Sequence, residues 1–143
     1  MIPNFNEDGN LPPEIHNATW KEIETRFGYT IHRKKLLEGL KLAIIDLKEV
    51  GCRKIYLDGS FITIKPRPND YDVCYDPTFD LGLLKARHPI FFDFKNKRKN
   101  QKDKYMGEFW PSHYMLDGVY NILDGFQIEK YTKRKKGIIE LNI

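Results

Sequence analysis

Two strand-like segments joined by a glycine–serine turn and a short spacer constrain the fold of this chain most strongly. Lys54–Leu57 has the apolar, β-prone composition of a strand and runs into Gly59 and Ser60. Nine residues separate Ser60 from Asp70, which directly precedes a second such segment, Tyr71–Tyr75. Two prolines in the spacer make a helix across it unfavourable. The pattern therefore predicts two sheet strands with an irregular connection.

The residues at the ends of these strands indicate a particular chemistry. Glycine at position 59 permits a backbone conformation that exposes successive N–H groups, and Ser60 adds a hydroxyl, so the turn could hold a phosphate. Side chains alternate along a strand, so Asp70 and Asp72 are expected to point the same way. Two adjacent carboxylates repel each other unless a cation lies between them. The combination indicates a site for a Mg²⁺–nucleotide complex.

This pattern resembles the signature of the nucleotidyltransferase superfamily, which has the DNA polymerase β-like fold. That signature is an apolar residue, Gly, Gly or Ser, a spacer of about nine to thirteen residues, and then Asp, apolar, Asp or Glu, apolar. The chain departs from it at one position, because Asp58 occupies the apolar place before Gly59 and Leu57 stands one residue further away.

The resemblance implies a reaction and a set of roles. A nucleoside monophosphate would pass from a nucleoside triphosphate, such as ATP, to a hydroxyl of a protein or an RNA, which could be a tRNA. Gly59 and Ser60 would bind the phosphates, while Asp70 and Asp72 would bind two Mg²⁺ ions, for which Mn²⁺ could substitute. The superfamily takes a third carboxylate from a later strand, and Asp93 in the predicted strand His88–Phe94 is the candidate. The alternative is an edge-strand aspartate that faces solvent or caps a turn.

Three lysines could steady the triphosphate, and the sequence does not choose among them. They are Lys65, Lys102 and Lys104.

The whole chain also resembles a family of small bacterial and phage nucleotidyltransferase-like proteins of undefined function. The segments that carry this likeness are Ile2–Phe5, Gly9–Pro13, Arg26–Gly28, Tyr56–Phe61, Asn69–Asp72 and Lys136–Ile139. Minimal nucleotidyltransferases of this size occur in toxin–antitoxin pairs. The resemblance therefore adds a toxin–antitoxin or phage-defence context, with a co-encoded protein as one partner, at the level of analogy.

Length and periodicity predict one α+β domain over residues 1–143. The resemblance implies the minimal nucleotidyltransferase fold, in which helices pack on a mixed β-sheet. Residues 1–18 are expected to be extended. The other expected elements are a short helix from Thr19 to Gly28, a long helix at Arg33–Val50, helices at Leu81–Ala86 and Leu116–Phe126, and a C-terminal β-hairpin with arms Gln127–Tyr131 and Ile138–Ile143.

Composition excludes several classes of protein. No apolar run is long enough to span a bilayer, and the N-terminus lacks the basic start and apolar run of a signal peptide. Cys52 and Cys74 lie in strand-like surroundings and are more simply read as small buried hydrophobes than as a disulfide. We therefore predict a cytoplasmic protein without a membrane partner.

Basic residues are concentrated in two segments, although the net charge is only +4. Six lie in Lys95–Lys104 and five in Lys130–Lys136. Such clusters attract polyanions, and the alternatives are a solvated helix face and a charged hairpin tip. Two other functions thus remain open beside catalysis. One is a catalytically silent nucleotide- or partner-binding module of the antitoxin kind, and the other is a nucleic-acid-binding protein.

Overall fold

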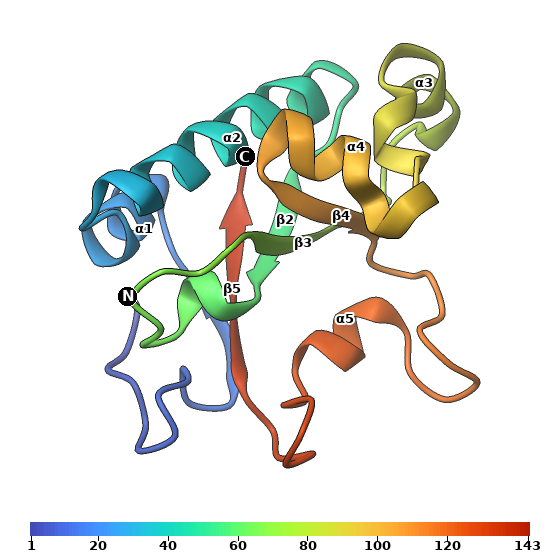
Figure 1. Cartoon of the computed structure of the whole chain (residues 1–143). Coiled ribbons are helices and arrows are strands. Elements are labelled where there is room, and N and C mark those ends of the chain that lie inside the picture. Colours follow the sequence, from blue (N-terminus) through green and yellow to red (C-terminus); the bar gives the residue numbers. More distant parts are fainter.

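A mixed sheet of five strands forms the centre of the protein, in a computed structural model that describes residues 1–143 (Figure 1). The strands are β1 (Glu14–Asn17), β2 (Lys54–Asp58), β3 (Tyr71–Tyr75), β4 (Gly107–Pro111) and β5 (Gly137–Asn142). Their order in the sheet is β1-β5-β2-β3-β4. Strand β2 is antiparallel to both of its neighbours, whereas β1 with β5 and β3 with β4 form parallel pairs. The predicted α+β class with a mixed sheet is therefore confirmed.

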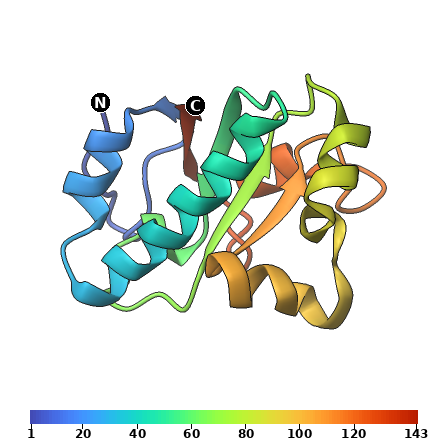
Figure 2. The same cartoon turned by 90° about the horizontal axis from the view of Figure 1, so that it is seen from above.

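Helices cover the two faces of this sheet unequally. Figure 2 shows α1, α2 and α4 in front of the sheet and the α5 segment behind it. The helices are α1 (Trp20–Phe27), α2 (Ile31–Glu49), α3 (Leu81–Arg87), α4 (Lys95–Tyr105) and α5 (Ile122–Phe126). A cluster of 24 buried apolar residues lies on the side of α1 to α4, against 5 on the α5 side. The α5 face therefore has room for polar side chains. None of the helices has both the length and the apolar character needed to cross a membrane.

Local sequence signals explain the first two helices. Thr19 and Glu22 form a capping box at the start of α1, in which each side chain accepts a hydrogen bond from the backbone N–H of the other residue. Helix α2 begins after Thr30, whose hydroxyl accepts from the Arg33 N–H at 3.0 Å. Buried residues at helical spacing then turn one side of α2 toward the sheet; they include Leu36, Leu40, Ala43 and Leu47. Both predicted helices are confirmed, with α2 starting two residues earlier than expected.

The spacer between β2 and β3 is held by a buried arginine of α2. The Arg33 guanidinium is fully buried and donates to five backbone carbonyls. Four of these belong to the segment that follows the Gly59-Ser60 turn: Phe61, Thr63, Lys65 and Pro66. Burial lowers the pKa of Arg33, and the carbonyls compensate its charge. One side chain therefore orders a connection that has no regular structure beyond a 3-10 turn at Ser60–Ile62.

Gly39 allows α2 to touch the end of α4. A Cβ atom at this position would lie 1.9 Å from the carbonyl oxygen of Tyr105, which is backbone and cannot rotate away. We expect Gly39→Ala to destabilise the fold by about 1–3 kcal/mol, because the two helices must separate. Gly118→Ala is the matched control, since nothing lies within 4 Å of its Cβ position. Chemical denaturation of both variants checks this prediction, and equal stability would contradict it.

Three predicted elements are wrong or shortened. His88–Phe94 is not a strand: Pro89–Phe92 forms a 3-10 helix, with proline at its start, where the missing N–H costs nothing. Of the predicted Leu116–Phe126 helix, only α5 forms.

The predicted C-terminal hairpin has only its second arm. This arm is β5, which lies between β1 and β2, while the first arm makes a single bridge from Ile128 to Lys135. The N-terminal segment 1–18, which was expected to be extended, includes strand β1.

Candidate functional site

Three carboxylates form a row across the sheet on the face that α5 covers. In the strand register, Asp58 of β2 pairs with Asp72 of β3, and Asp72 pairs with Glu108 of β4. Cross-strand partners point to the same side of a sheet. Two residues along the same strands from these carboxylates are Tyr56, Cys74 and Trp110, which pack against α5. The three carboxylates therefore point to the α5 side as well.

Asp70 joins this row and completes a group that could hold a metal ion. Carboxylate oxygens of Asp70, Asp72 and Glu108 all lie within 4.8 Å of one another. The Oδ1 atom of Asp72 is buried and has no hydrogen-bond partner. An unpartnered buried carboxylate oxygen is costly, and a divalent cation would compensate it. The all-oxygen ligand set suits Mg²⁺ or Mn²⁺. We call Asp70, Asp72 and Glu108 the carboxylate cluster.

The electrostatics of the carboxylate cluster would favour a bound cation. Burial raises the pKa of Asp72 well above its usual range, and the carboxylates of Asp58, Glu108 and Asp70 raise it further. Burial also raises the pKa of Asp70, with Glu108 adding to the effect. Both raised pKa values mean that the ionised carboxylates of Asp70 and Asp72 are unfavourable in the folded protein without a bound cation.

Basic side chains pair with the carboxylates at the two ends of the row, and none pairs with Asp72 in the middle. Lys136 bonds to Asp58 at one end. At the other end, the Arg98 Nε lies 2.7 Å and the Lys102 Nζ 3.5 Å from the same oxygen of Glu108. Asp72 has no ion pair. Lys136 thus neutralises much of the charge of Asp58, the residue at which the sequence departs from the superfamily signature. Burial still raises the Asp58 pKa.

The Gly59-Ser60 turn lies directly beside Asp72. Gly59 has φ +93°, and a Cβ there would lie 3.2 Å from the Asp72 backbone nitrogen and 3.3 Å from its Oδ2. Ser60 begins the 3-10 turn, and no side chain caps the N-terminus of that turn. A phosphate on this turn would therefore lie next to the carboxylate cluster, as the sequence predicts.

If the Gly59-Ser60 turn holds a phosphate, Gly59→Ala should weaken nucleotide binding as well as lower stability. An L side chain at this φ costs about 1–2 kcal/mol, and its Cβ would push against the Asp72 carboxylate. Gly51→Ala is the matched control, because Gly51 also has a positive φ of +99° but its Cβ would meet nothing closer than 3.7 Å. Calorimetric titration with Mg²⁺ and a non-hydrolysable nucleoside triphosphate should show weaker binding for Gly59→Ala alone. Equal losses in both variants would count against a phosphate site at this turn.

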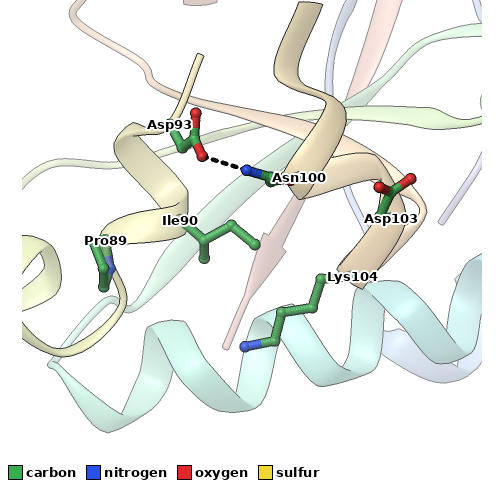
Figure 3. Close-up of a pocket in the computed structure, with 6 residues that line it drawn as sticks. All are labelled: Pro89, Ile90, Asp93, Asn100, Asp103 and Lys104. Carbon is green, nitrogen blue, oxygen red and sulfur yellow. Dashed lines mark hydrogen bonds between the residues drawn. The ribbon is translucent and has the colours of Figure 1, made fainter. Parts of the chain in front are cut away.

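Asp93 does not lie in the carboxylate cluster. Figure 3 shows it in a separate pocket with Ile90 and Asn100, where its carboxylate accepts from the Asn100 side chain at 2.8 Å. Its other oxygen accepts from the Lys95 backbone N–H at 3.2 Å. These hydrogen bonds lower the pKa of Asp93, the Asn100 bond most strongly. The geometry thus matches the alternative of a turn-capping aspartate and not that of a third ligand beside Asp70 and Asp72.

Glu108 occupies the place that the sequence reasoning gave to Asp93. It was missed because Gly107–Pro111 is short and bounded by glycine and proline, so the segment was not recognised as a strand. The adjacent aromatic residues Phe109 and Trp110, which favour strands, are the sequence signal that could have found it.

The three candidate lysines lie in different surroundings. Lys102 contacts Glu108, as described above, and the charges of Lys102 and Lys65 lower the pKa of Asp70 against the effect of burial. Lys104 faces Asp46 instead, at 3.8 Å, on the side of α2. The structure therefore brings Lys65 and Lys102 to the carboxylate cluster and leaves Lys104 outside it.

Fold and site together define an α+β protein with a carboxylate cluster on one face of a mixed five-stranded sheet. A family model described as a family of unknown function (DUF6932) matches residues 3–142, so the chain belongs to this family. A search of curated proteins found no match, and neither did a search of solved structures. The resemblance to nucleotidyltransferases therefore stays a prediction.

Proposed function

We propose that this protein is a metal-dependent nucleotidyltransferase, which transfers a nucleoside monophosphate from a nucleoside triphosphate to a hydroxyl of a protein or RNA. The observation that carries the proposal is the meeting of Asp70, Asp72 and Glu108 beside the Gly59-Ser60 turn. A phosphate cradle next to three carboxylates from two adjacent strands is the arrangement that two-metal phosphoryl transfer requires. The order of these residues along the chain also agrees with the superfamily pattern.

The metal ligands in this proposal are the residues of the carboxylate cluster. The buried, unpartnered oxygen of Asp72 and the raised pKa values of Asp70 and Asp72 support a divalent cation there. When bound, Mg²⁺ or Mn²⁺ would neutralise charge on the phosphates and on the acceptor oxygen. The backbone N–H groups at Gly59 and Ser60, with the Ser60 hydroxyl, would hold the terminal phosphates, and Lys65 and Lys102 would add positive charge.

The reaction then needs positioning more than covalent chemistry. The acceptor hydroxyl oxygen attacks the α-phosphorus in line, and a new P–O bond forms. The bond from the α-phosphorus to the bridging oxygen breaks, and pyrophosphate leaves with that electron pair. The hydroxyl proton passes to a carboxylate of the cluster on the acceptor side. The superfamily resemblance implies this role for Asp93, and Glu108 is better placed to perform it.

The acceptor is the part of the proposal that the chain constrains least. An anionic acceptor such as RNA is favoured by the basic segment Lys130–Lys136, in which Lys130, Lys133 and Lys135 form no ion pair. Lys136 connects this segment to Asp58 at the end of the carboxylate row. A polyanion bound there would therefore reach the site, and its binding would weaken with salt.

A labelling screen tests the proposed function. Each of four α-labelled nucleoside triphosphates is incubated with Mg²⁺ or Mn²⁺ and with total tRNA, cell lysate or a co-encoded neighbour protein. We expect one combination to yield a labelled acceptor with the wild-type protein and none with the Asp70→Ala/Asp72→Ala double variant. Asp103→Ala, which removes an exposed carboxylate paired with Lys99, is the control that should label normally. Equal labelling by the double variant would overturn the proposal.

A catalytically silent binding module is the second candidate, favoured by the ion pairs that already occupy Asp58 and Glu108. It predicts that nucleotide, RNA or a partner protein binds equally well to the wild type and to the Asp70→Ala/Asp72→Ala variant. Binding that is lost with the two aspartates would exclude it.

A further inference from the structure

Arg98 forms an ion pair with Glu108, which a metal ion bound at the carboxylate cluster would also need. Its Nε lies 2.7 Å from Glu108 Oε1, and Glu108 is largely buried, with 13% of its side chain exposed. Lys102 approaches the same oxygen at 3.5 Å. The positive charge is therefore concentrated on Glu108, while the neighbouring Asp72 oxygen has no partner. A divalent cation shared by these carboxylates would compete with Arg98 for Glu108.

The backbone that carries Arg98 is held in an unfavourable conformation. Asn96, Lys97 and Arg98 are three consecutive residues in the left-handed region, with φ between +52° and +61°. For residues with a side chain this conformation costs about 1–2 kcal/mol each. The Asp93 carboxylate spans the turn, because it accepts from Lys95 before it and from Asn100 after it. Such strain persists where surrounding contacts impose it, and it concentrates at functional sites.

Trp110 lies under the Arg98 guanidinium and reports its position. The Arg98 Cζ is 4.9 Å from the centre of the Trp110 ring. On the α5 side, Trp110 packs edge-on against Phe126, with ring centres 5.9 Å apart. The chain has one other tryptophan, Trp20, in α1. A movement of Arg98 would therefore change the surroundings of a single indole once Trp20 is replaced.

We propose that Arg98 is a counter-ion that leaves Glu108 when a divalent cation binds and then binds the phosphates of the nucleotide. This inference rests on the proposed nucleotidyltransferase function. Before metal binds, Arg98 and Lys102 keep the buried Glu108 paired. With Glu108 bound to a cation, the freed guanidinium would remain near Asp70, beside the proposed triphosphate site. The planar guanidinium can donate two parallel hydrogen bonds to phosphate oxygens, whereas a lysine ammonium acts as a point charge. Metal and nucleotide binding are then coupled through one side chain.

The opposite signs of two affinity changes test this role. In a Trp20→Phe background, Trp110 fluorescence is followed during titration with Mg²⁺ alone, and then with a non-hydrolysable nucleoside triphosphate in saturating Mg²⁺. We expect Arg98→Gln to bind Mg²⁺ alone several-fold more tightly and the nucleotide about tenfold more weakly, since one charge-assisted contact to phosphate is lost. Arg98→Lys should retain most of the competition for metal and lose much of the nucleotide affinity. Lys99→Gln, on the exposed side of α4, should change neither.

The possible failures are distinguishable. If Mg²⁺ and nucleotide bind with the same affinities to Arg98→Gln and to the parent, the role of Arg98 is wrong and the proposed function stands. If Arg98→Gln binds Mg²⁺ more weakly, Arg98 supports the site and does not compete for it, which also overturns the inference. If the parent binds neither Mg²⁺ nor any of the four nucleotides, the inference and the proposed function both fail.

Discussion

Glu108→Gln should reduce nucleotidyl transfer by at least about 100-fold, because a metal-bound carboxylate contributes several kcal/mol of transition-state stabilisation. The substitution keeps the shape of the side chain and removes its charge. It also frees Arg98 and Lys102 from their ion pairs. The loss should appear in both metal affinity and turnover, because the same carboxylate would bind the metal and accept the acceptor proton.

Asp93→Asn is the decisive comparison for this prediction. The sequence pattern made Asp93 the third carboxylate, whereas the structure places it in a turn away from Asp70 and Asp72. We expect Asp93→Asn to keep most of the activity, with a small loss through the position of Arg98. Rates are measured on the labelled acceptor from the screen, at saturating Mg²⁺. Loss of activity in Asp93→Asn together with retention in Glu108→Gln would restore the original assignment and remove Glu108 from the mechanism.

Asp72→Asn should make the metal-free protein more stable while it abolishes metal binding. The substitution removes a charge that Asp58, Glu108 and Asp70 all repel, and it gives the buried position an amide that can donate to its neighbours. An unsatisfied buried group costs about 1–3 kcal/mol, which sets the expected gain in the free energy of unfolding. Added Mg²⁺ should raise the melting temperature of the wild type and leave that of Asp72→Asn unchanged.

The same repulsion predicts a pH dependence of the metal-free wild type. The folded-state pKa values of Asp72, Asp70 and Asp58 are raised above the unfolded value of 3.8. The folded state therefore binds more protons between the unfolded and folded pKa values, and stability falls as pH rises through that window. Acidification from neutral pH toward the ordinary carboxyl range should stabilise the wild type, and Asp72→Asn should show a smaller gain. Carboxylates with lowered pKa values, such as Asp93, act below that range and oppose the gain only there.

Melting curves over this pH range, with chelator present, check both statements. Asp103→Asn is the control, because its exposed pair with Lys99 contributes little to stability. An Asp72→Asn protein that is less stable than the wild type without metal would show that the Asp72 charge is satisfied, contrary to this account.

The sequence predicted elements whose signals are local. Helix α1 has a capping box, helix α2 has a long apolar face, and β3 consists of β-prone residues of which Tyr71, Val73 and Tyr75 face the main core. These features depend on neighbours within a few residues, so pattern reasoning finds them. The Gly59-Ser60 turn and the Asp70–Asp72 pair were found for the same reason, and the structure places them side by side.

The rest depends on contacts between distant parts of the chain. Glu108 enters the cluster only through the parallel register of β3 and β4, which pairs residues 36 positions apart, Asp72 with Glu108. Strand β5 lies between β1 and β2 and not in a hairpin, because two distant strands offer it partners.

The segment around Phe91 was also mispredicted because of contacts with distant residues. Its aromatic residues suggest a strand, yet Phe91 instead stacks on Tyr105 at 5.1 Å and packs edge-on against Phe109. Tertiary packing decided that segment against its local pattern.

Counting bound Mn²⁺ tests the central claim most directly. Electron paramagnetic resonance of free Mn²⁺ measures how many ions the protein removes from solution in the presence of each non-hydrolysable nucleoside triphosphate, after subtraction of binding by the nucleotide alone. The account predicts saturable binding of about two ions per chain with at least one nucleotide, as two-metal sites require. It also predicts loss of that binding in Asp70→Asn/Asp72→Asn and in Glu108→Gln, but not in Asp93→Asn. Absence of protein-dependent binding with all four nucleotides, or unchanged binding in the Asp70→Asn/Asp72→Asn variant, would contradict it.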